Sequence, residues 1–239
     1  MTCHLRLRLC ETDRPGLPVE VPIDEVILVG YSGRDRAAVE AHIRELELLG
    51  VAPPPRVPAI YTVPPELVTT GSRLVVNGRA TSGEAEFVLV RSPHGVLVGV
   101  GSDHTDRARE AIDVAESKAL CGKVMSYEVW PLHALESHWD RLELRAWTTD
   151  GSGRRLYQEG RLDSLLAPDH LFEEVERAGA ISTTTPSRGL IFSGTLPTLG
   201  GFAFGSQFEV ELWDPVLERH LRCAYHIVMH AGDPASPGP

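Results

Sequence analysis

Two glutamates, Glu84 and Glu86, stand at the entrance of an apolar run within residues 81–90 (TSGEAEFVLV). The run that follows them predicts a buried strand. Two negative charges at such a place are costly unless a cation or hydrogen-bond donors meet them. A fold that buries this strand must therefore also supply the partners of its carboxylates.

A third carboxylate, Asp103, follows one predicted strand later, within residues 101–107 (GSDHTDR). Strands at 84–91 and 95–101 should pair as a hairpin through the turn at 93–95, which would bring Asp103 beside the two glutamates. Alternate residues of a strand share a face and lie roughly 6.6 Å apart, so long glutamate side chains can converge on one ion. Three carboxylates suit Mg²⁺, Mn²⁺ or Ca²⁺. The alternative is two solvated glutamates at the start of a strand.

The composition is that of an ordinary soluble protein, with 42% hydrophobic and 23% charged residues in a chain of 239. The net charge of -10 and the lack of a Lys/Arg cluster predict no nucleic-acid partner. No apolar stretch is long enough for a membrane span, and residues 1–10 (MTCHLRLRLC) alternate like a strand rather than a signal peptide. The four cysteines form no CxxC pair, so we expect reduced thiols and a cytoplasmic protein.

Strand signals outnumber helix signals and do not alternate with them regularly, which favours a β-rich mixed fold over a doubly wound parallel sheet. Strands are predicted at 3–9, 26–29, 84–91, 95–101, 141–148, 154–161, 189–193, 207–213 and 222–229. Helices are predicted at 34–49, at 105–120 with Ile112 on its inner side, and at 168–178. We divide the chain into an N-terminal segment, 1–25, packed on the core, a domain over 26–230, and a disordered tail, 231–239.

The predicted helix at 34–49 carries His42 and Glu45, whose spacing of three places them on the same side. Glu45 can accept a hydrogen bond from one imidazole nitrogen and leave the other free as a base. A proline-rich connector follows this helix, and such a connector would allow the helix to act as a movable lid. An exposed contact between a histidine and a glutamate would explain the same spacing.

Two other segments offer groups to an anion. Lys123 follows a predicted helix, where a lysine can favour the helix dipole, neutralise a surplus carboxylate or meet an anionic substrate. Residues 192–197 (FSGTLP) predict a tight turn whose backbone N–H groups and hydroxyl, at Gly194 and Thr195, could face a carboxylate, or which is only a turn. Ser32 lies in a partial nucleophile-elbow pattern, but Arg34 stands where that pattern has glycine.

Taken together, these segments resemble the fumarylacetoacetate hydrolase superfamily, and more narrowly an uncharacterised bacterial branch of it that is known only as a domain-of-unknown-function family. The resemblance runs from about Val26 to Met229. The family's E-x-E metal pair falls on Glu84 and Glu86, and its Asn-Asp-x-Ser/Thr-x-Arg segment falls on residues 102–107. Its Gly-Lys, Thr-Gly-Thr and His-x-x-Glu motifs fall on the other candidate residues named above. The chain departs from the family pattern at 30–33, at Val63 in place of a lysine, and at Ser102 in place of an asparagine.

The resemblance implies an α+β fold rich in strands, a mixed β-sandwich or roll of the type of the family's C-terminal domain with a few flanking helices. It also implies a homodimer. The implied activity is that of an enzyme that uses Mg²⁺ (or Mn²⁺ or Ca²⁺) to act on a small anionic keto acid or β-diketo acid. A metal-stabilised enolate would form during C–C bond hydrolysis or decarboxylation.

The resemblance assigns a role to each candidate residue: metal ligands Glu84, Glu86 and Asp103; catalytic residues His42 and Glu45; substrate-binding residues Lys123, Gly194 and Thr195. Hydrolase, decarboxylase, isomerase and hydratase chemistry share the enolate and stay open. Two other functional classes also stay open. One is a non-catalytic, metal-dependent keto-acid-binding protein, and the other is a serine hydrolase that uses Ser32.

Overall fold

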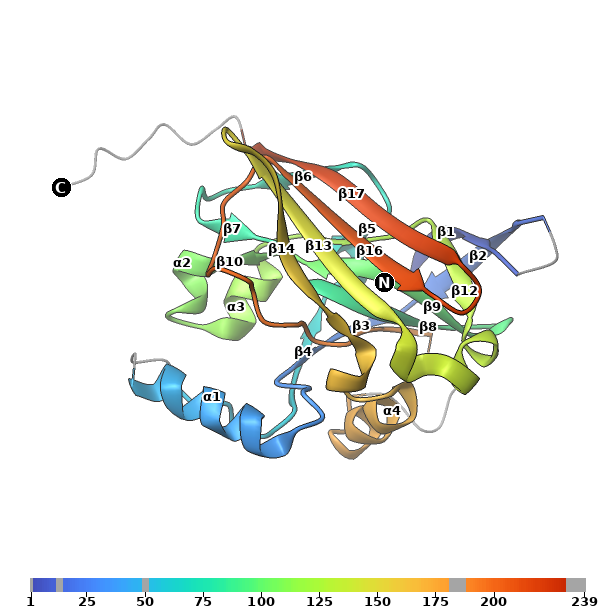
Figure 1. Ribbon diagram of the computed structural model, residues 1–239, viewed down its shortest axis with the longest axis horizontal. Helices are drawn as coiled ribbons and strands as arrows, with labels where there is room; N and C mark the ends of the chain where they lie inside the picture. Colours follow the sequence, from blue (N-terminus) through green and yellow to red (C-terminus); the bar gives the residue numbers. More distant parts are fainter. Residues whose placement is uncertain (1, 12–14, 49–51, 181–187, 231–239) are drawn as a thin grey trace.

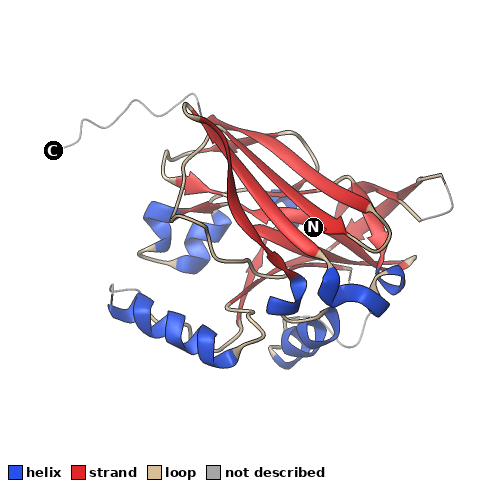
Figure 2. Ribbon diagram, in the orientation of Figure 1, coloured by secondary structure: helices blue, strands red, loops and turns tan. Residues whose placement is uncertain are grey.

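Two twisted β-sheets pack face to face and the helices lie along their margins (Figures 1 and 2). The computed structural model describes residues 2–11, 15–48, 52–180 and 188–230, apart from the side chains of His42 and Leu46. The predicted tail at 231–239 therefore lies outside the described residues. None of the helices that the structure describes is long and apolar enough to cross a membrane.

The larger sheet has ten strands, eight of which follow the order β2-β1-β12-β9-β8-β15-β3-β4, while β11 pairs with β9 and β5 beside this path. These strands are β1 Cys3–Leu9, β2 Leu17–Ile23, β3 Glu25–Gly30, β4 Ala59–Val63, β5 Val68–Thr69, β8 Ala85–Ser92, β9 Gly95–Asp103, β11 Lys123–Met125, β12 Glu128–Pro131 and β15 Gly189–Phe192. Because β1 pairs with β12, the N-terminal hairpin of β1 and β2 continues this sheet.

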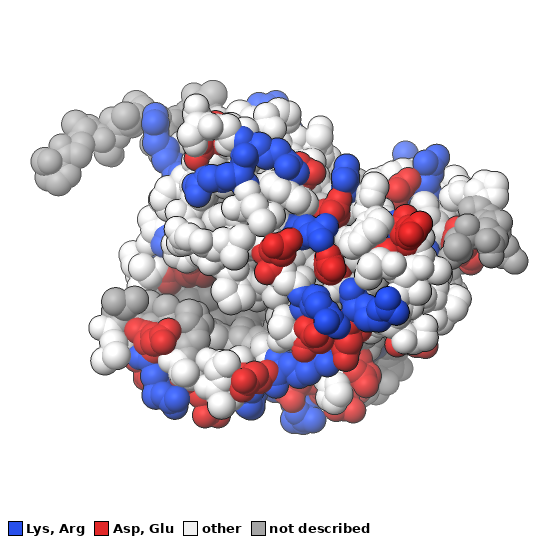
Figure 3. All heavy atoms as spheres, viewed as in Figure 1, with Lys and Arg blue, Asp and Glu red and all other residues white. Residues whose placement is uncertain are grey.

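The second sheet has five strands in the order β14-β13-β16-β17-β6, and a separate small pair joins β10 to β7. Their bounds are β6 Arg73–Val76, β7 Thr81–Ser82, β10 Thr105–Asp106, β13 Glu143–Asp150, β14 Gly153–Arg161, β16 Gln207–Asp214 and β17 Arg219–Met229. The outer face of the five-stranded sheet is polar, and basic and acidic side chains lie close together on the face shown in Figure 3. Ion pairs such as Arg154–Glu209 and Arg222–Glu211 belong to this sheet.

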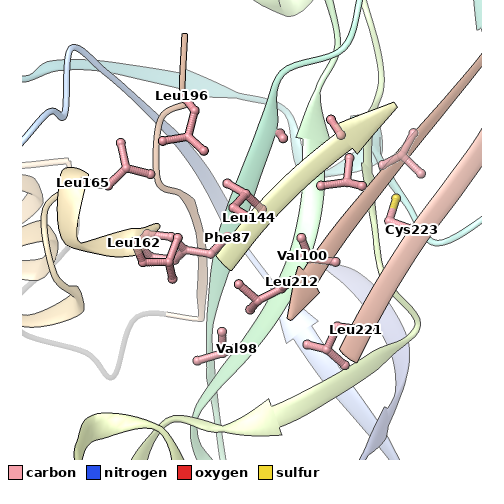
Figure 4. Packing of buried hydrophobic residues seen from close by; sticks show 14 of the residues in the cluster. Phe87, Val98, Val100, Leu144, Leu162, Leu165, Leu196, Leu212, Leu221 and Cys223 are labelled. Atoms are coloured by element: carbon pink, nitrogen blue, oxygen red, sulfur yellow. The ribbon is translucent and has the colours of Figure 1, made fainter. Parts of the chain in front are cut away.

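Strand β8 is buried on both of its faces, which explains why its sequence is a continuous apolar run rather than an alternating one. Phe87 and Leu89 join the hydrophobic core between the two sheets, while Val88 and Val90 join a second core on the opposite face. Figure 4 shows Phe87 and Val100 packed with Leu144, Leu212 and Leu221 from the smaller sheet. The hairpin that ends in the three carboxylates is thus held at the centre of the protein.

Three of the helices begin after an aspartate that accepts from free backbone N–H groups, while the helix at Pro168–Arg177 begins with a proline and has no side-chain cap. Asp35 Oδ1 accepts from the N–H groups of Ala37 and Ala38, at 2.9 and 3.1 Å, and starts the first helix. The helices are α1 Arg36–Leu48, α2 Arg107–Glu110, α3 Val114–Ala119 and α4 Pro168–Arg177, with short 3₁₀ turns at Pro65–Leu67, Leu132–Ala134, Glu136–Arg141 and Leu162–Ser164. In Figure 1, α1 lies at the edge of the molecule on the same side as α2 and α3.

The predicted helix at 105–120 is wrong as a single element. The chain first forms β10 and then two short helices, each begun by its own aspartate: Asp106 accepts from Arg109 N and Asp113 accepts from Glu116 N. An aspartate that caps a new helix offers the backbone an alternative to continuing the previous one. Ile112, which we expected on the inner side, lies in the break between the two helices and is 73% exposed.

The other predicted helices and the strands named above are all present, with ends that differ by a few residues. The paired hairpin of β8 and β9 is also confirmed, with Glu86 opposite Gly101 and Ala85 opposite Ser102. Gly101 is required at its position because a Cβ there would lie 2.6 Å from the backbone carbonyl oxygen of Val124 and 3.0 Å from Val88.

Gly101→Ala should therefore lower the free energy of unfolding by about 1–3 kcal/mol, the usual cost of overpacking a core. Gly99→Ala on the same strand is the matched control, since the three atoms nearest to its Cβ would belong to the side chains of Met125, Ser126 and Val129, at 3.0, 3.2 and 3.5 Å, and none to the backbone. Urea unfolding measures both variants. Equal losses in the two would show that the backbone contact at Gly101 is not the cause.

Candidate metal centre

The β8–β9 hairpin brings the three predicted metal ligands to one place. Glu84 directly precedes β8 and Asp103 ends β9, and the backbone N–H of Asp103 donates to the carbonyl oxygen of Glu84 at 3.1 Å. One oxygen from each of Glu84, Glu86 and Asp103 lies within 4.8 Å of the others. The carboxylates therefore converge on a volume that one ion could fill.

This site is nearly closed to water. Glu86 is 2% exposed and Asp103 is 1% exposed, while the side chain of Glu84 keeps 13% of its surface. Buried carboxylates need hydrogen bonds or opposite charges to compensate for their lost hydration. The surrounding side chains supply both.

Three cationic side chains meet these carboxylates. Arg107 Nη1 donates to Glu84 Oε1 at 2.9 Å and also to Glu110 at 2.7 Å. Lys118 Nζ lies 3.0 Å from Glu84 Oε2 and 2.5 Å from Asp103 Oδ2. Lys123 Nζ lies 2.6 Å from Asp103 Oδ1 and donates to the carbonyl oxygen of His104 at 2.8 Å.

The cations leave one negative charge uncompensated, since Glu84, Glu86, Asp103 and Glu110 face only three cationic groups. The imbalance falls on Glu86. Its burial, together with the negative charges of Asp103 and Glu84, raises the pKa of Glu86 well above the usual value for a carboxyl.

The other two ligands ionise readily in spite of their burial. Burial opposes the charge on Glu84, but Lys118 and Arg107 together hold the pKa of Glu84 below its ordinary value. In the same way Lys118 and Lys123 outweigh the burial of Asp103 and hold its pKa low. An all-oxygen ligand set with one surplus negative charge fits a hard divalent cation, with Glu84, Glu86 and Asp103 as the residues that would hold it.

The turn after β15 is fixed to this cluster. The backbone N–H of Gly194 donates to Glu86 Oε2 at 2.9 Å. Gly194 has a φ of +86°, and a Cβ there would lie 2.1 Å from Ser32 Oγ and 2.7 Å from the carbonyl oxygen of Val29. Only glycine can bring its N–H so close to the carboxylate at this point.

The hydroxyl of Thr195 is engaged within the protein. Its Oγ1 donates to the carbonyl oxygen of Ala85 at 2.8 Å and accepts from Gln158 Nε2 at 2.7 Å. Gln158 Oε1 in turn accepts from the N–H of Ala85 at 3.0 Å. Gly194 and Thr195 thus lie at the site and attach it to β8, and their contact with a substrate stays a prediction.

Lys123 is completely buried, and its contacts with Asp103 and His104 make it the counter-charge of a ligand. Of the alternatives that the sequence left open for this lysine, neutralisation of a surplus carboxylate is the one that its contacts support. A role in substrate binding stays a prediction.

A neutral hydrogen-bonded network that no sequence motif predicts adjoins the predicted ligands. Tyr225 OH donates to Ser102 Oγ at 2.8 Å and lies 2.9 Å from His104 Nδ1, while Ser102 Oγ accepts from the N–H of Glu84 at 3.2 Å. Burial, with help from Lys123 and Arg107, lowers the pKa of His104 to about 3, so its imidazole is uncharged at neutral pH. Ser102, which stands where the resemblance places an asparagine, therefore supports the backbone of a ligand.

Aromatic side chains approach the cluster from other elements. The guanidinium of Arg107 stacks on Phe202, with 4.3 Å between its central carbon and the ring centroid. Burial and the nearby charge of Glu110 raise the pKa of Tyr31. Burial also raises the pKa of Tyr61, and the positive charge of Lys118 opposes part of this rise. The ring of Phe202 therefore covers one face of the Arg107 guanidinium.

The predicted catalytic pair lies on α1, with Glu45 on its exposed surface. The side chain of His42 lies outside the described residues, so the pairing of His42 with Glu45 stays a prediction. Ser32 is 3% exposed, and its Oγ has no hydrogen-bond partner among the residues that the structure describes. The structure therefore provides no support for an activated serine at this position.

No motif in the sequence predicted a role for Lys118, whose nitrogen contacts two of the three predicted ligands. One signal was available: the chain has 21 arginines and only two lysines, Lys118 and Lys123. Both lysines contact Asp103. Lysine occurs at two of 239 positions, and both lysines lie at the same carboxylate. The rarity of lysine is therefore as clear a sign of the site as the E-x-E pattern.

Comparisons with known proteins agree with this fold. The family model described as "Protein of unknown function (DUF2848)" matches residues 29–225. A search of the curated proteins gives no match.

Three solved structures show how widely the fold is shared. Cg1458 with an inhibitor is 17% identical over 95% of this chain and 90% of its own, with a TM-score of 0.64. The apo form of 2-keto-3-deoxy-D-arabinonate dehydratase is 16% identical over 87% of this chain and 74% of its own, with a TM-score of 0.59. Yeast ynq8, a fumarylacetoacetate hydrolase family protein, is 14% identical over 91% of this chain and 95% of its own, with a TM-score of 0.55. The predicted β-rich fold of this type is confirmed.

The raised pKa of Glu86 leads to a test on metal-free protein. The carboxyl of Glu86 ionises near 4.5 when the chain is unfolded but only at a higher pH in the folded protein. The contribution of Glu86 to stability is therefore lost as the pH rises above about 4.5. Glu86→Gln removes this loss and keeps an acceptor for Gly194.

With EDTA present, Glu86→Gln should be more stable than the wild type at pH 8, by roughly 1–3 kcal/mol, and should lose most of this advantage at pH 5. Urea unfolding at both pH values measures the difference. The control is Glu159→Gln, which removes an exposed carboxylate on β14. An advantage of equal size at both pH values would contradict the assignment.

Proposed function

This chain belongs to the family described as "Protein of unknown function (DUF2848)", and from its site we propose that it is a divalent-metal-dependent enzyme acting on a small keto acid or β-diketo acid. One observation carries this proposal: three buried carboxylates converge within 4.8 Å, and burial together with the charges of the other two raises the pKa of Glu86. A binding pocket for a hard cation is the simplest use for such a costly arrangement.

Mg²⁺ is the proposed ion, with Mn²⁺ or Ca²⁺ as substitutes, and its ligands are Glu84, Glu86 and Asp103. When bound, such an ion polarises a substrate carbonyl and stabilises the enolate left by C–C bond cleavage or decarboxylation. Lys123 and Arg107 keep Asp103 and Glu84 ionised and in place. Gly194 orients Glu86 through its N–H, and Thr195 holds that turn on β8.

A carboxylate and an adjacent keto oxygen form the bidentate group that fits an ion held on one side by protein oxygens. One of the proteins with this fold is a dehydratase of 2-keto-3-deoxy-D-arabinonate, which is a keto acid by name. This supports the substrate class for the present chain and leaves the reaction type open among C–C hydrolysis, decarboxylation, isomerisation and hydration. A homodimer in the cytoplasm is the further expectation that we carry over from the resemblance.

Glu84→Ala should remove metal binding. In the wild type, saturating Mn²⁺ at 100 times its dissociation constant should stabilise the fold by about 2.7 kcal/mol, seen as a higher melting temperature. The variant should show no such rise, because a ligand and the partner of two cations are lost. Glu159→Gln should respond like the wild type. A wild-type melting temperature that ignores Mg²⁺ and Mn²⁺ would contradict the proposal.

His42→Ala tests the proposed proton transfer by the pair on α1. We expect the variant to keep its melting temperature and its response to Mn²⁺ but to lose turnover by roughly 10²- to 10⁴-fold, as is usual for a general base. Glu45→Gln should lose less, since Glu45 acts through the histidine. Full activity in His42→Ala, measured across a panel of keto acids, would remove the pair from the mechanism.

Two alternatives have distinct outcomes in the same experiments. A non-catalytic binder would take up oxalate or pyruvate with Mn²⁺ and show no turnover with any member of the panel. A serine hydrolase would resist EDTA and be labelled at Ser32 by a fluorophosphonate. The missing partner of Ser32 Oγ among the described residues weighs against this second alternative.

A further inference from the structure

The side chain of Lys118 occupies the oxygens that a metal ion would need. Both oxygens of Glu84 and both oxygens of Asp103 already lie beside cationic nitrogens: Arg107 and Lys118 flank Glu84, and Lys118 and Lys123 flank Asp103. Of the three cationic side chains described at the site, only Lys118 contacts two of the predicted ligands. It therefore stands between the carboxylates rather than behind one of them.

Withdrawal of Lys118 would free one oxygen on each of the two residues, Glu84 Oε2 and Asp103 Oδ2. The third ligand, Glu86, accepts from Gly194 through Oε2, so Oε1 is the oxygen that it would offer to the ion. One oxygen from each carboxylate would then be available. The other three would keep Arg107, Lys123 and Gly194 as partners and stay oriented.

We propose that the ammonium of Lys118 is a built-in counter-ion which stabilises the metal-free site and which a divalent cation displaces when it binds. This inference rests on the proposed function, since it needs the three carboxylates to bind an ion. A hard cation takes ligand oxygens at about 2.0–2.6 Å. Two positive groups cannot occupy one set of oxygens at such distances, because like charges repel strongly in a buried site.

The two lysines differ in their freedom to move. Lys123 lies within β11, which is paired on both sides with β9 and β5, and it is completely buried. Lys118 lies in the last turn of α3, a helix of six residues at the surface, where the following residues Ala119 and Leu120 are exposed. A flexible four-carbon stem can carry the ammonium of Lys118 from the carboxylates to water.

The residue types at the site agree with a fixed Arg107 and a movable Lys118. The chain uses arginine at 21 positions and lysine at two. The planar guanidinium of Arg107 is held by Glu84, Glu110 and the ring of Phe202, an arrangement suited to a permanent structural contact. A compact ammonium on a flexible stem is instead suited to exchange with another compact cation.

Chemical labelling of the wild type tests the displacement directly, because its only amines are two lysines and the N-terminus. The protein is acetylated with acetic anhydride in EDTA and again in saturating Mn²⁺, and the peptides are quantified by mass spectrometry. We expect labelling of Lys118 to become at least ~10-fold faster with Mn²⁺, as its ammonium moves from a buried ion pair into water. Lys123 should stay unlabelled, and the N-terminus should react equally in both conditions.

A variant gives an independent measurement. Lys118→Met should bind Mn²⁺ at least ~10-fold more tightly than the wild type by calorimetry, since the ion no longer competes with an ammonium. Its metal-free form should melt at a lower temperature, and saturating Mn²⁺ should close that gap. Arg109→Met is the control, because it removes a charge from neighbouring α2 that contacts none of the ligands. Lys118→Arg should not gain affinity.

The outcomes separate this inference from the proposed function. If the wild type binds Mn²⁺ while Lys118 stays protected and Lys118→Met binds no more tightly, the displacement is overturned and the metal site remains. If the wild type binds no ion but Lys118→Met does, competition by Lys118 is supported and the wild type is not a metal-dependent enzyme. If neither protein binds an ion, both ideas fail.

Discussion

The burial of negative charge at the end of the β8–β9 hairpin is the constraint on which the site depends. The hairpin is central because β8 packs on both faces, so its end cannot be moved to the surface without opening both cores. The carboxylates are therefore kept where their hydration is lost. Segments far apart in the chain meet this cost: Arg107 from α2, Lys118 from α3, Lys123 from β11 and the N–H of Gly194 after β15. The packing of these segments around the hairpin therefore brings positive charges and a hydrogen-bond donor to the buried carboxylates.

The charged side chains at the site, called the charged layer below, adjoin two kinds of uncharged side chain. Below them, Tyr225, Ser102 and His104 provide hydrogen bonds without charge, since burial holds the imidazole neutral. Around them, the ring of Phe202 stacks on Arg107, and the partly buried Tyr31 and Tyr61 are close enough for Glu110 and Lys118 to affect their pKa values. A low local polarity strengthens every interaction within the layer, including one with an incoming ion or a developing enolate. The same property makes an unpaired charge expensive, which is why the layer needs a cation in the metal-free state.

The sequence predicted those parts of this arrangement that follow from local patterns. The alternation and length of apolar runs located the strands, and the spacing of Glu84 and Glu86 on one strand with Asp103 at the end of the next predicted their convergence. The helix at 105–120 failed because two aspartates, Asp106 and Asp113, each cap a new helix, and this break cannot be read from the apolar pattern. That error also hid Lys118, because its direction depends on where α3 begins. The contacts of Thr195 and Tyr225 join distant segments, and no local pattern encodes them.

The departures from the family pattern become intelligible once these contacts are known. Val63, in place of a lysine, is 3% exposed and packs in the second hydrophobic core, where an ammonium would have no partner. Ser102, in place of an asparagine, is short enough to accept from both Tyr225 and the N–H of Glu84 within the buried network. With Val63 in the apolar core, the described positive charge at the carboxylates comes from Arg107 and the two lysines. A site whose compensation is concentrated in so few groups is sensitive to each of them. Among the cationic groups that the structure describes, Lys118 is the one that contacts two of the three carboxylates, so the site depends most on Lys118.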